Sequence, residues 1–341
     1  MVLVSADVIW WGNDRIDALR RRIRSLSGLE HAAIVLHATH NHSGPQTSQA
    51  LSPSIGEASP AYLELLEDSL VDGVREAFGA CEPVTPERGL GHCGIGVHRR
   101  RMRDGQIHMA PDTEGANDSE CTVVRFRRED GSTKSVLVHF TCHPTTTAEN
   151  SLSAEFCGSA MTFIESELGS GVVAGFLQGC CGDIRPALVR NGEFYRGNAA
   201  DVRRLGSELA DVCLAVLSRP MQECEPALCC VSTIAVPLLF QTNDSPVLLE
   251  LTRITLARGL GVLFFNAEMV VEYGLLVKQR SNGAVLPVAY SNGMLGYVTT
   301  ERQLAEGGYE SREAFRYFAM PGPFAATTEL RVREAINALL L

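Results

Sequence analysis

Two histidines separated by one residue carry the most evident chemistry of this sequence. His40 and His42 belong to the stretch Ala38–Pro45, which reads Ala-Thr-His-Asn-His-Ser-Gly-Pro and follows the apolar run Ala32–Leu36. The apolar run is typical of a buried strand, and the glycine and proline end regular structure. On an extended backbone both imidazoles point to the same face, so one can bind a metal while the other contacts what the metal holds. The alternative is a pair of solvated loop histidines.

Three further polar residues stand at or beside the ends of predicted strands. His143 closes the strand predicted over 135–141, Glu268 follows the strand predicted over 261–266, and Tyr297 lies beyond the strand predicted over 285–290. Ligands of open α/β sheets bind at strand ends, and histidine and carboxylate are common zinc ligands. The alternatives are a hydrogen-bonded core histidine and a glutamate that complements a helix dipole.

A glycine-rich loop, 178–186, follows the strand predicted over 172–177. Its glycines allow the backbone to approach another part of the chain closely. Asp183 in this loop either orients a ligand histidine or caps the turn. The loop lacks the lysine and the spacing of a phosphate-binding P-loop, which argues against nucleotide binding there.

The elements that must position these residues follow from apolar periodicity. The opening strand, helix and strand predict a parallel β-α-β unit, with Asn13 as a helix cap and Gly28 as its end. Residues 80–118 show weak periodicity and are interpreted as a loop that forms one wall of the site. We predict an α/β fold with a mixed β-sheet flanked by helices on both faces, in a single domain over residues 1–341. Strands are predicted at 2–11, 32–36, 121–127, 135–141, 172–177, 226–240, 247–257, 261–266 and 285–290, and helices near 16–26, 60–78, 198–217, 268 onward and 328–341.

Composition narrows the class of protein. The 341 residues are 45% apolar and 21% charged, as in ordinary globular proteins. A formal charge of −10 argues against a nucleic-acid partner. No signal peptide or run of 18 apolar residues is evident, so we expect a cytoplasmic protein without a transmembrane segment. We expect its eleven cysteines to be reduced and buried. Because the chain starts directly on a core strand, we expect a missing preceding segment.

Several motifs of this sequence resemble motifs of the neutral, non-lysosomal ceramidases, and they occur in the same order along the chain. The resemblance covers nearly the whole chain, and its specificity comes from six stretches in matching order. They are 3–7 (the first core strand), 38–45 (T-H-x-H-S-G-P), His143-Pro144 (H-P), 178–186 (Q-G-x-x-G-D-V-x-P), 266–268 (the P-G-E turn) and 297–300 with Tyr309-Glu310 (Y-V-T-T…Y-E).

The resemblance implies a zinc-dependent hydrolase that cleaves an amide (N-acyl) bond of a small-molecule or lipid-like substrate. The zinc ligands that it implies are His40, His143, Glu268 and Tyr297. The residues that it places around the scissile amide are His42, Tyr309 and Arg99. The alternative for Arg99 is a solvated basic turn, because it opens a run of three arginines.

The sequence departs from the family pattern in three places. Arg185 stands where the family's G-D-V-S-P loop has a serine that has been considered as a nucleophile, so metal-activated water is favoured. The family's glycine-rich segment before the first core strand is absent. Its C-terminal β-sandwich is absent too, so the resemblance covers the catalytic domain and leaves the substrate open.

The mechanistic hypothesis is that Zn²⁺ lowers the pKa of water towards ~7 for attack on an amide carbonyl. His42 then acts as general acid/base, and Tyr309 and Arg99 donate to the developing oxyanion. One alternative is a peptidase, deacetylase, esterase or lactonase acting on a small polar substrate, which a short charged pocket favours over a long apolar groove. The other is a catalytically inactive binding relative.

Overall fold

The chain opens with two parallel strands joined by a helix. A computed structural model describes residues 1–30, 33–242 and 245–341. β1 (Val2–Ala6) pairs in parallel with β2 (Ile34–Ala38), and α1 (Ile16–Ser27) connects them and ends at left-handed Gly28. The predicted β-α-β opening is confirmed, although Ala32 lies outside the described residues. The strand predicted over 2–11 is too long, because after β1 the apolar run continues as a buried loop. Asn13 does not cap α1; its side chain bonds to the backbone of Met294.

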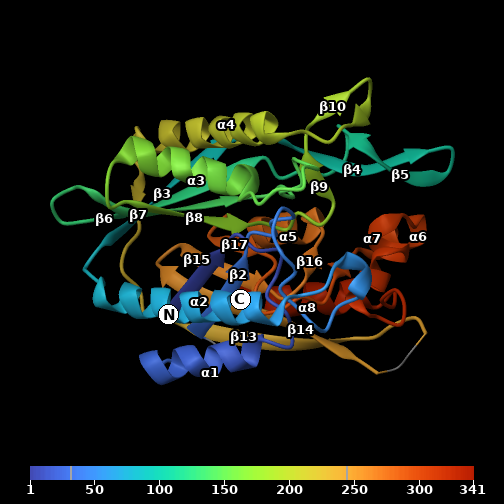
Figure 1. Cartoon of the computed structure of the whole chain (residues 1–341), viewed down its shortest axis with the longest axis horizontal. Coiled ribbons are helices and arrows are strands. Elements are labelled where there is room, and N and C mark those ends of the chain that lie inside the picture. The colour runs from blue at the N-terminus through green and yellow to red at the C-terminus, as the bar shows by residue number, and fades with distance from the viewer. Residues whose placement is uncertain (31–32, 243–244) are drawn as a thin grey trace.

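A five-stranded sheet forms the first large layer, with antiparallel and parallel pairs. The predicted hairpin between its third and fourth strands is confirmed. The sheet has the order β12 (Gln222–Glu223), β3 (Thr85–His92), β6 (Glu120–Arg127), β7 (Thr133–Phe140), β8 (Val173–Gln178). The helices α3 (Glu155–Leu168) and α4 (Ala199–Leu217) lie above it in Figure 1. Phe156 of α3 packs edge-on against Phe176 of β8, with ring centroids 6.2 Å apart.

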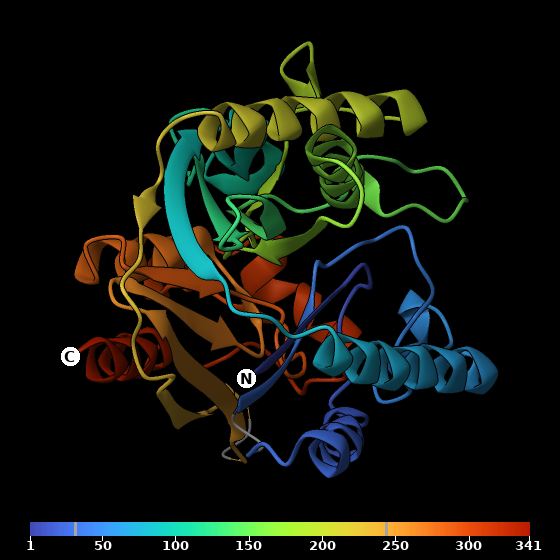
Figure 2. The ribbon, with the colours of Figure 1, turned by 90° about the vertical axis from the view of Figure 1, so that its left-hand side faces the viewer.

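A four-stranded sheet forms the second layer. Its order is β13 (Val231–Leu238), β14 (Val247–Ala257), β15 (Leu260–Phe265), β17 (Val285–Val288). β14 and β15 are antiparallel, as predicted, whereas β15 and β17 are parallel and joined by α5 (Val271–Arg280). α8 (Thr328–Leu340) packs against β13. The fold is therefore α/β with mixed strand directions, and Figure 2 shows helices on both sides of the strands.

The predicted loop over 80–118 is wrong, because these residues form β3, β4 (Gly96–Arg103) and β5 (Gln106–Asp112). β4 lies between β5 and β9 (Ile184–Pro186). Glycines in β3 and arginines in β4 obscure the alternation of apolar and polar residues that would have predicted these strands. The pair Asp104-Gly105, with φ of 51° and 76°, makes the β4–β5 turn and is a hairpin pattern that the interpretation overlooked.

The remaining elements are short or peripheral. They are η2 (Pro53–Ile55), α2 (Pro60–Gly79), β10 (Val189–Arg190), β11 (Glu193–Phe194), β16 (Glu268–Met269), β18 (Tyr297–Val298), α6 (Glu301–Glu306), α7 (Tyr309–Arg312) and η3 (Ala314–Phe318). Pro60 begins α2 and Ser59 caps it, and both residue types are common at these positions of a helix start.

One large apolar cluster joins the two layers through β1 and β2. All eleven thiols are free, and eight are buried as expected, but Cys81, Cys229 and Cys230 are exposed. Among the described residues, no helix combines the length and the apolar character needed to cross a bilayer. The extent of the domain, 1–341, stays a prediction.

Candidate metal centre

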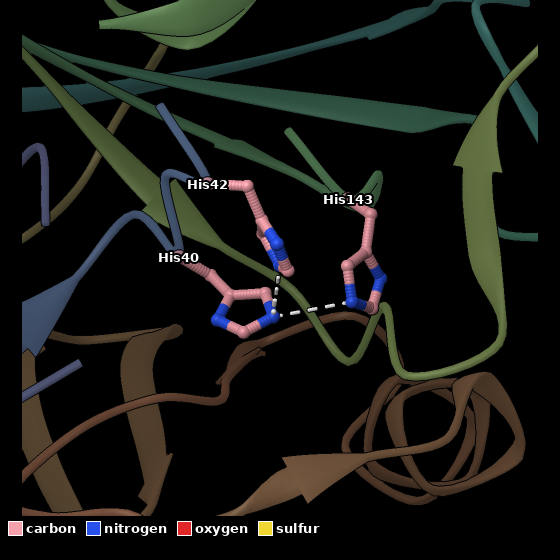
Figure 3. A group of neighbouring side chains, drawn as sticks. All are labelled: His40, His42 and His143. Carbon is pink, nitrogen blue, oxygen red and sulfur yellow. Dashed lines mark hydrogen bonds between the residues drawn. The ribbon is translucent and has the colours of Figure 1, made fainter. Parts of the chain in front are cut away.

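Two buried histidines that follow strands of different sheets meet in the interior. His40 follows β2, His143 follows β7, and their Nε2 atoms are 3.1 Å apart (Figure 3). Their exposed fractions are 0% and 1%. His40 is not extended, as the sequence interpretation assumed: its φ is 64°, a left-handed value that is uncommon for a residue with a side chain. This left-handed turn of the backbone, and not the alternation of side chains along a strand, brings the rings of His40 and His42 together.

Backbone carbonyls fix the tautomers of both rings. Nδ1 of His40 donates to the carbonyl of Ile9 at 2.9 Å. Nδ1 of His143 donates to the carbonyls of Cys181 and Ile184 at 2.5 and 3.1 Å. Because a carbonyl only accepts, each Nδ1 carries a proton, so in the neutral form of either ring the lone pair is on the Nε2 that faces the other ring. Two facing lone pairs repel unless a cation lies between them, so these residues fit a metal ion.

His42 completes a group of three imidazoles. Its Nε2 is 3.1 Å from Nε2 of His40 and points towards the other two rings in Figure 3. The residue keeps an exposed surface, unlike the two buried histidines. Burial of the ring and the neighbouring His40 and His143 lower the pKa of His42 well below its usual value. His42 is therefore a neutral base at the open side of the group.

Glu268 supplies a carboxylate to the same point. Its Oε2 lies 3.4 Å from Nε2 of both His40 and His143, and 2% of the residue is exposed. Burial raises the pKa of this carboxyl, but the two histidines outweigh burial and hold it well below its usual range. The helix-dipole alternative is wrong, because Glu268 lies in β16 and α5 begins only at Val271.

Tyr297 stands beside Glu268 in the parallel β16–β18 pair, where the two residues are register partners. Its hydroxyl accepts a 3.0 Å hydrogen bond from Arg99. Burial raises the pKa of Tyr297 well above its usual value, while the charge of Arg99 lowers it. The Tyr309 ring lies edge-on to Tyr297, with centroids 5.6 Å apart. These contacts bring the sequence-predicted site residues into one neighbourhood; their roles stay predictions.

Arg99 is buried, so the interpretation of the arginine run as a solvated turn is wrong for its first residue. Its guanidinium carbon lies 5.6 Å from the Tyr297 ring centroid and 5.7 Å from that of Tyr309. Glu310 accepts from Nε of Arg99 at 2.7 Å and from Arg100 at 2.6 Å. Glu310 thereby anchors Arg99 at the site, a role that sequence reasoning did not assign to it.

Asp183 does not orient a ligand histidine. Its carboxylate accepts hydrogen bonds from the backbone N–H of Val271 at 2.8 Å and from the side chains of Gln303 and His98 at 2.8 and 3.3 Å. The backbone carbonyls around it hold His143 instead. The close approach expected of the loop's glycines is confirmed at Gly182, where a Cβ would lie 3.0 Å from a backbone oxygen of β16.

Tyr290 is a site residue that the sequence interpretation missed. Its ring stacks on His40 with centroids 4.0 Å apart, and its hydroxyl lies 3.1 Å from Sγ of Cys181 and 3.5 Å from Oε2 of Glu268. Its φ of 54° is strained for a tyrosine, a feature that clusters at functional sites. The predicted strand over 285–290 had placed it among apolar core residues, and no motif distinguished it.

Comparisons with known proteins support the fold. No family model and no curated protein match the chain. Among solved structures, it is similar to a neutral ceramidase from Pseudomonas aeruginosa, with a TM-score of 0.77 and 17% identity over 99% of this chain and 66% of that one. A ceramidase complexed with C2 gives a TM-score of 0.80 and 16% identity over 99% and 67%. The chain spans about two thirds of the length of each of these proteins. Over nearly all its residues, the chain has the fold seen in neutral ceramidase structures.

Proposed function

We propose that the chain is a zinc-dependent hydrolase that cleaves a linear amide (N-acyl) bond with water. The observation that carries the proposal is the convergence of His40, His42 and His143, each of which offers a ring nitrogen within 4.8 Å of those of the other two. The protons on Nδ1 of His40 and His143 leave lone pairs where a cation is needed. The fold shared with neutral ceramidases supports the same chemistry.

The residues that would hold Zn²⁺ are His40, His143, Glu268 and Tyr297. Two imidazoles, a carboxylate and an oxygen ligand form a donor set that suits zinc. Bound there, the ion would supply a Lewis acid for the carbonyl and bring the pKa of water near ~7. Tyr297 is the weakest ligand of the set, because its hydroxyl already accepts a hydrogen bond from Arg99.

The other side chains have separable tasks in this proposal. His42, whose ring is neutral although part of the residue is exposed, accepts a proton from the attacking water and returns it to the leaving amine. Tyr309 keeps its proton because burial raises its pKa, so its hydroxyl donates to the oxyanion. Arg99, held by Glu310, adds positive charge beside both tyrosines. The products are a carboxylate and an amine.

The experiment measures metal content and amine release together. Wild type, His40→Ala and His143→Ala are purified, their zinc is quantified, and a panel of N-acyl substrates of different chain length is tested. About one zinc per chain in wild type, lost in both variants together with hydrolysis, is the expected result. Wild type without metal, and without activity after zinc is added, would overturn the proposal and leave a binding protein on this fold.

A second candidate is hydrolysis of a small polar substrate, and the space beside the site favours its small size. A cavity of about 20 Å³ borders Tyr297 and Glu310 and is walled by Phe315, Met320 and Phe324. That volume holds roughly one water molecule, which is far less than a fatty-acyl chain needs. In the substrate panel, short acyl groups should then outperform long ones. A preference for long chains would favour a lipid-like substrate instead.

The cytoplasmic location expected from the sequence is part of the same proposal. Fractionation of cells that produce the natural protein tests it. Recovery with the membrane fraction would contradict it.

A further inference from the structure

Arg185 is a buried cation that has no acidic partner among the residues that the structure describes. It lies in β9 and is 8% exposed. Its guanidinium stacks over the Phe194 ring at 4.5 Å. Within the described chain its one side-chain hydrogen bond is a weak contact from an Nη atom to the sulfur of Met109 at 3.8 Å. Its Nε has no hydrogen-bond partner, and no acidic residue of the described chain forms an ion pair with it. A buried guanidinium left in this state is unfavourable unless an anion from solution joins it.

The strand that carries Arg185 is part of the candidate metal centre. The carbonyl of the preceding residue, Ile184, accepts the Nδ1 proton of His143. In the antiparallel β4–β9 register Arg185 pairs with Val97, so the two side chains share one face of the sheet. The charge of Arg99, two residues further along β4, contributes to the lowered pKa of Arg185, so the two guanidinium groups lie near each other. Arg185 therefore lies near the arginine that donates to the hydroxyl of Tyr297.

A second arginine, Arg196, stands at the solvent side of the same region. The residue is exposed, and its guanidinium donates to the carbonyl of Thr145 at 3.3 Å, two residues beyond His143. Its positive charge contributes to the lowered pKa of both His42 and Arg185, so it lies near both. No acidic residue among those described forms an ion pair with Arg196. This region thus carries one buried and one exposed cation, neither of which forms an ion pair with the described residues.

We propose that Arg185, assisted by Arg196, binds a carboxylate of the substrate, so that the hydrolysed amide belongs to a small acidic molecule of the N-acyl amino acid type. A carboxylate would satisfy the free N–H groups of Arg185 by charge-assisted, bidentate hydrogen bonding. Burial, with Arg196 and Arg99, lowers the pKa of Arg185 to about 10, which keeps it charged at neutral pH. This proposal rests on the proposed amide hydrolysis for the role of the ligand as substrate, whereas binding is measurable without turnover.

The test compares two probes that differ in one charge, N-acetylglycine and its methyl ester. Calorimetric titrations use the full chain, both zinc-loaded and treated with chelator, because a metal would also attract a carboxylate. Wild type should bind the acid about tenfold more tightly than the ester, or better, in both states. Arg185→Met should abolish that preference with zinc content unchanged. Arg190→Met is the matched control, because Arg190 also stacks on a ring, that of Tyr195 at 4.7 Å, but is exposed.

Each outcome decides the proposal. Equal affinity of wild type for acid and ester, or a preference that survives in Arg185→Met, overturns it. Tighter binding of inorganic phosphate or sulfate than of N-acetylglycine also overturns it, by assigning the arginines to another anion. If Arg185→Met does not fold, the exposed Arg196→Met must weaken binding of the acid and leave the ester unaffected. If wild type binds no zinc but still prefers the acid to the ester, the proposed hydrolase function is refuted and the proposed carboxylate site is retained.

Discussion

The Nε2 atoms of His40 and His143 face each other at 3.1 Å although 103 residues separate them in sequence. Each ring is held from behind by backbone carbonyls, so neither can turn away without losing a buried hydrogen bond. The two lone pairs are therefore preorganised at a distance that is unfavourable without a cation. A metal ion relieves the repulsion and gains two oriented ligands at once.

Replacing His143 with alanine should abolish zinc binding, whereas replacing His92 should not. The His143 variant removes one of two lone pairs that meet at the centre. His92→Ala is the matched control, because His92 is an exposed histidine of β3. Zinc per chain, measured by elemental analysis after dialysis, should fall from about one to near zero only in the first variant. Equal zinc in the two variants would contradict the proposed ligand set.

Glu310→Gln should destabilise the protein strongly. Its carboxylate accepts from Arg99 at 2.7 Å and from Arg100 at 2.6 Å, and both pairs are buried. Removing the carboxylate charge leaves two buried guanidinium groups without this anionic partner. Such a loss typically lowers the free energy of unfolding by about 3–5 kcal/mol. Urea unfolding measures the loss.

The control for Glu310 is Glu306→Gln. Glu306 also contacts Arg100, at 3.4 Å, but its side chain is 22% exposed. Solvent screens this pair, so its loss should be about 1 kcal/mol or less. Similar unfolding midpoints for the two variants would show that Arg99 and Arg100 do not depend on Glu310.

The strand ends were the part of the site that sequence could predict. His143 and Glu268 follow clear apolar runs, so their position at the edge of a layer follows from periodicity alone. Their convergence does not, because β7 and β16 belong to different sheets and no local pattern encodes how sheets pack. The family resemblance supplied that link.

Other parts of the site were hidden for physical reasons. The left-handed backbone of His40 has no local sequence pattern, because the bond to Ile9 and the packing of Tyr290 impose it. β4 was missed because its buried arginines are paired by residues about 200 positions away, so polarity suggested a loop. Of the two roles considered for Asp183, that of orienting a ligand histidine is wrong, because backbone carbonyls, which every residue has, hold His143 instead.

Glu272 should make stability fall as pH rises towards neutrality. Burial raises the pKa of its carboxyl from 4.5 to about 7, and the charge of Asp183 adds to the effect. The folded protein therefore holds a proton that the unfolded chain releases, so stability is full below about pH 4.5 and is lost as pH rises to about 7. The loss is up to about 3 kcal/mol.

The measurement is urea unfolding at pH 5 and pH 8. Glu272→Gln cannot ionise and should lose less stability than wild type between the two pH values. Glu334→Gln, which alters an exposed residue of α8, should behave like wild type. An unchanged pH difference in Glu272→Gln would show that other groups cause it.

Tyr309→Phe should slow hydrolysis without removing metal. The phenol is proposed to donate to the oxyanion, and losing one such donor commonly reduces kcat by about 10²–10³. Zinc content should stay near that of wild type, because Tyr309 is not a proposed ligand. Tyr317→Phe is the control, since Tyr317 is an exposed tyrosine whose ring lies 6.3 Å from that of Tyr309. A kcat equal to that of wild type would remove Tyr309 from the mechanism.

His42→Ala separates two interpretations of the three-histidine group. If His42 is the general acid/base, zinc stays bound and kcat falls by about 10²–10⁴. If His42 is instead a ligand, zinc is lost, as in His40→Ala. The geometry favours the first outcome, because Nδ1 of His40 and of His143 each have a carbonyl acceptor, whereas no hydrogen bond at Nδ1 of His42 is found among the described residues. If His42→Ala lowers the zinc affinity as far as His143→Ala does, His42 is a ligand. Tyr297 would then bond to Arg99 and would not be a ligand.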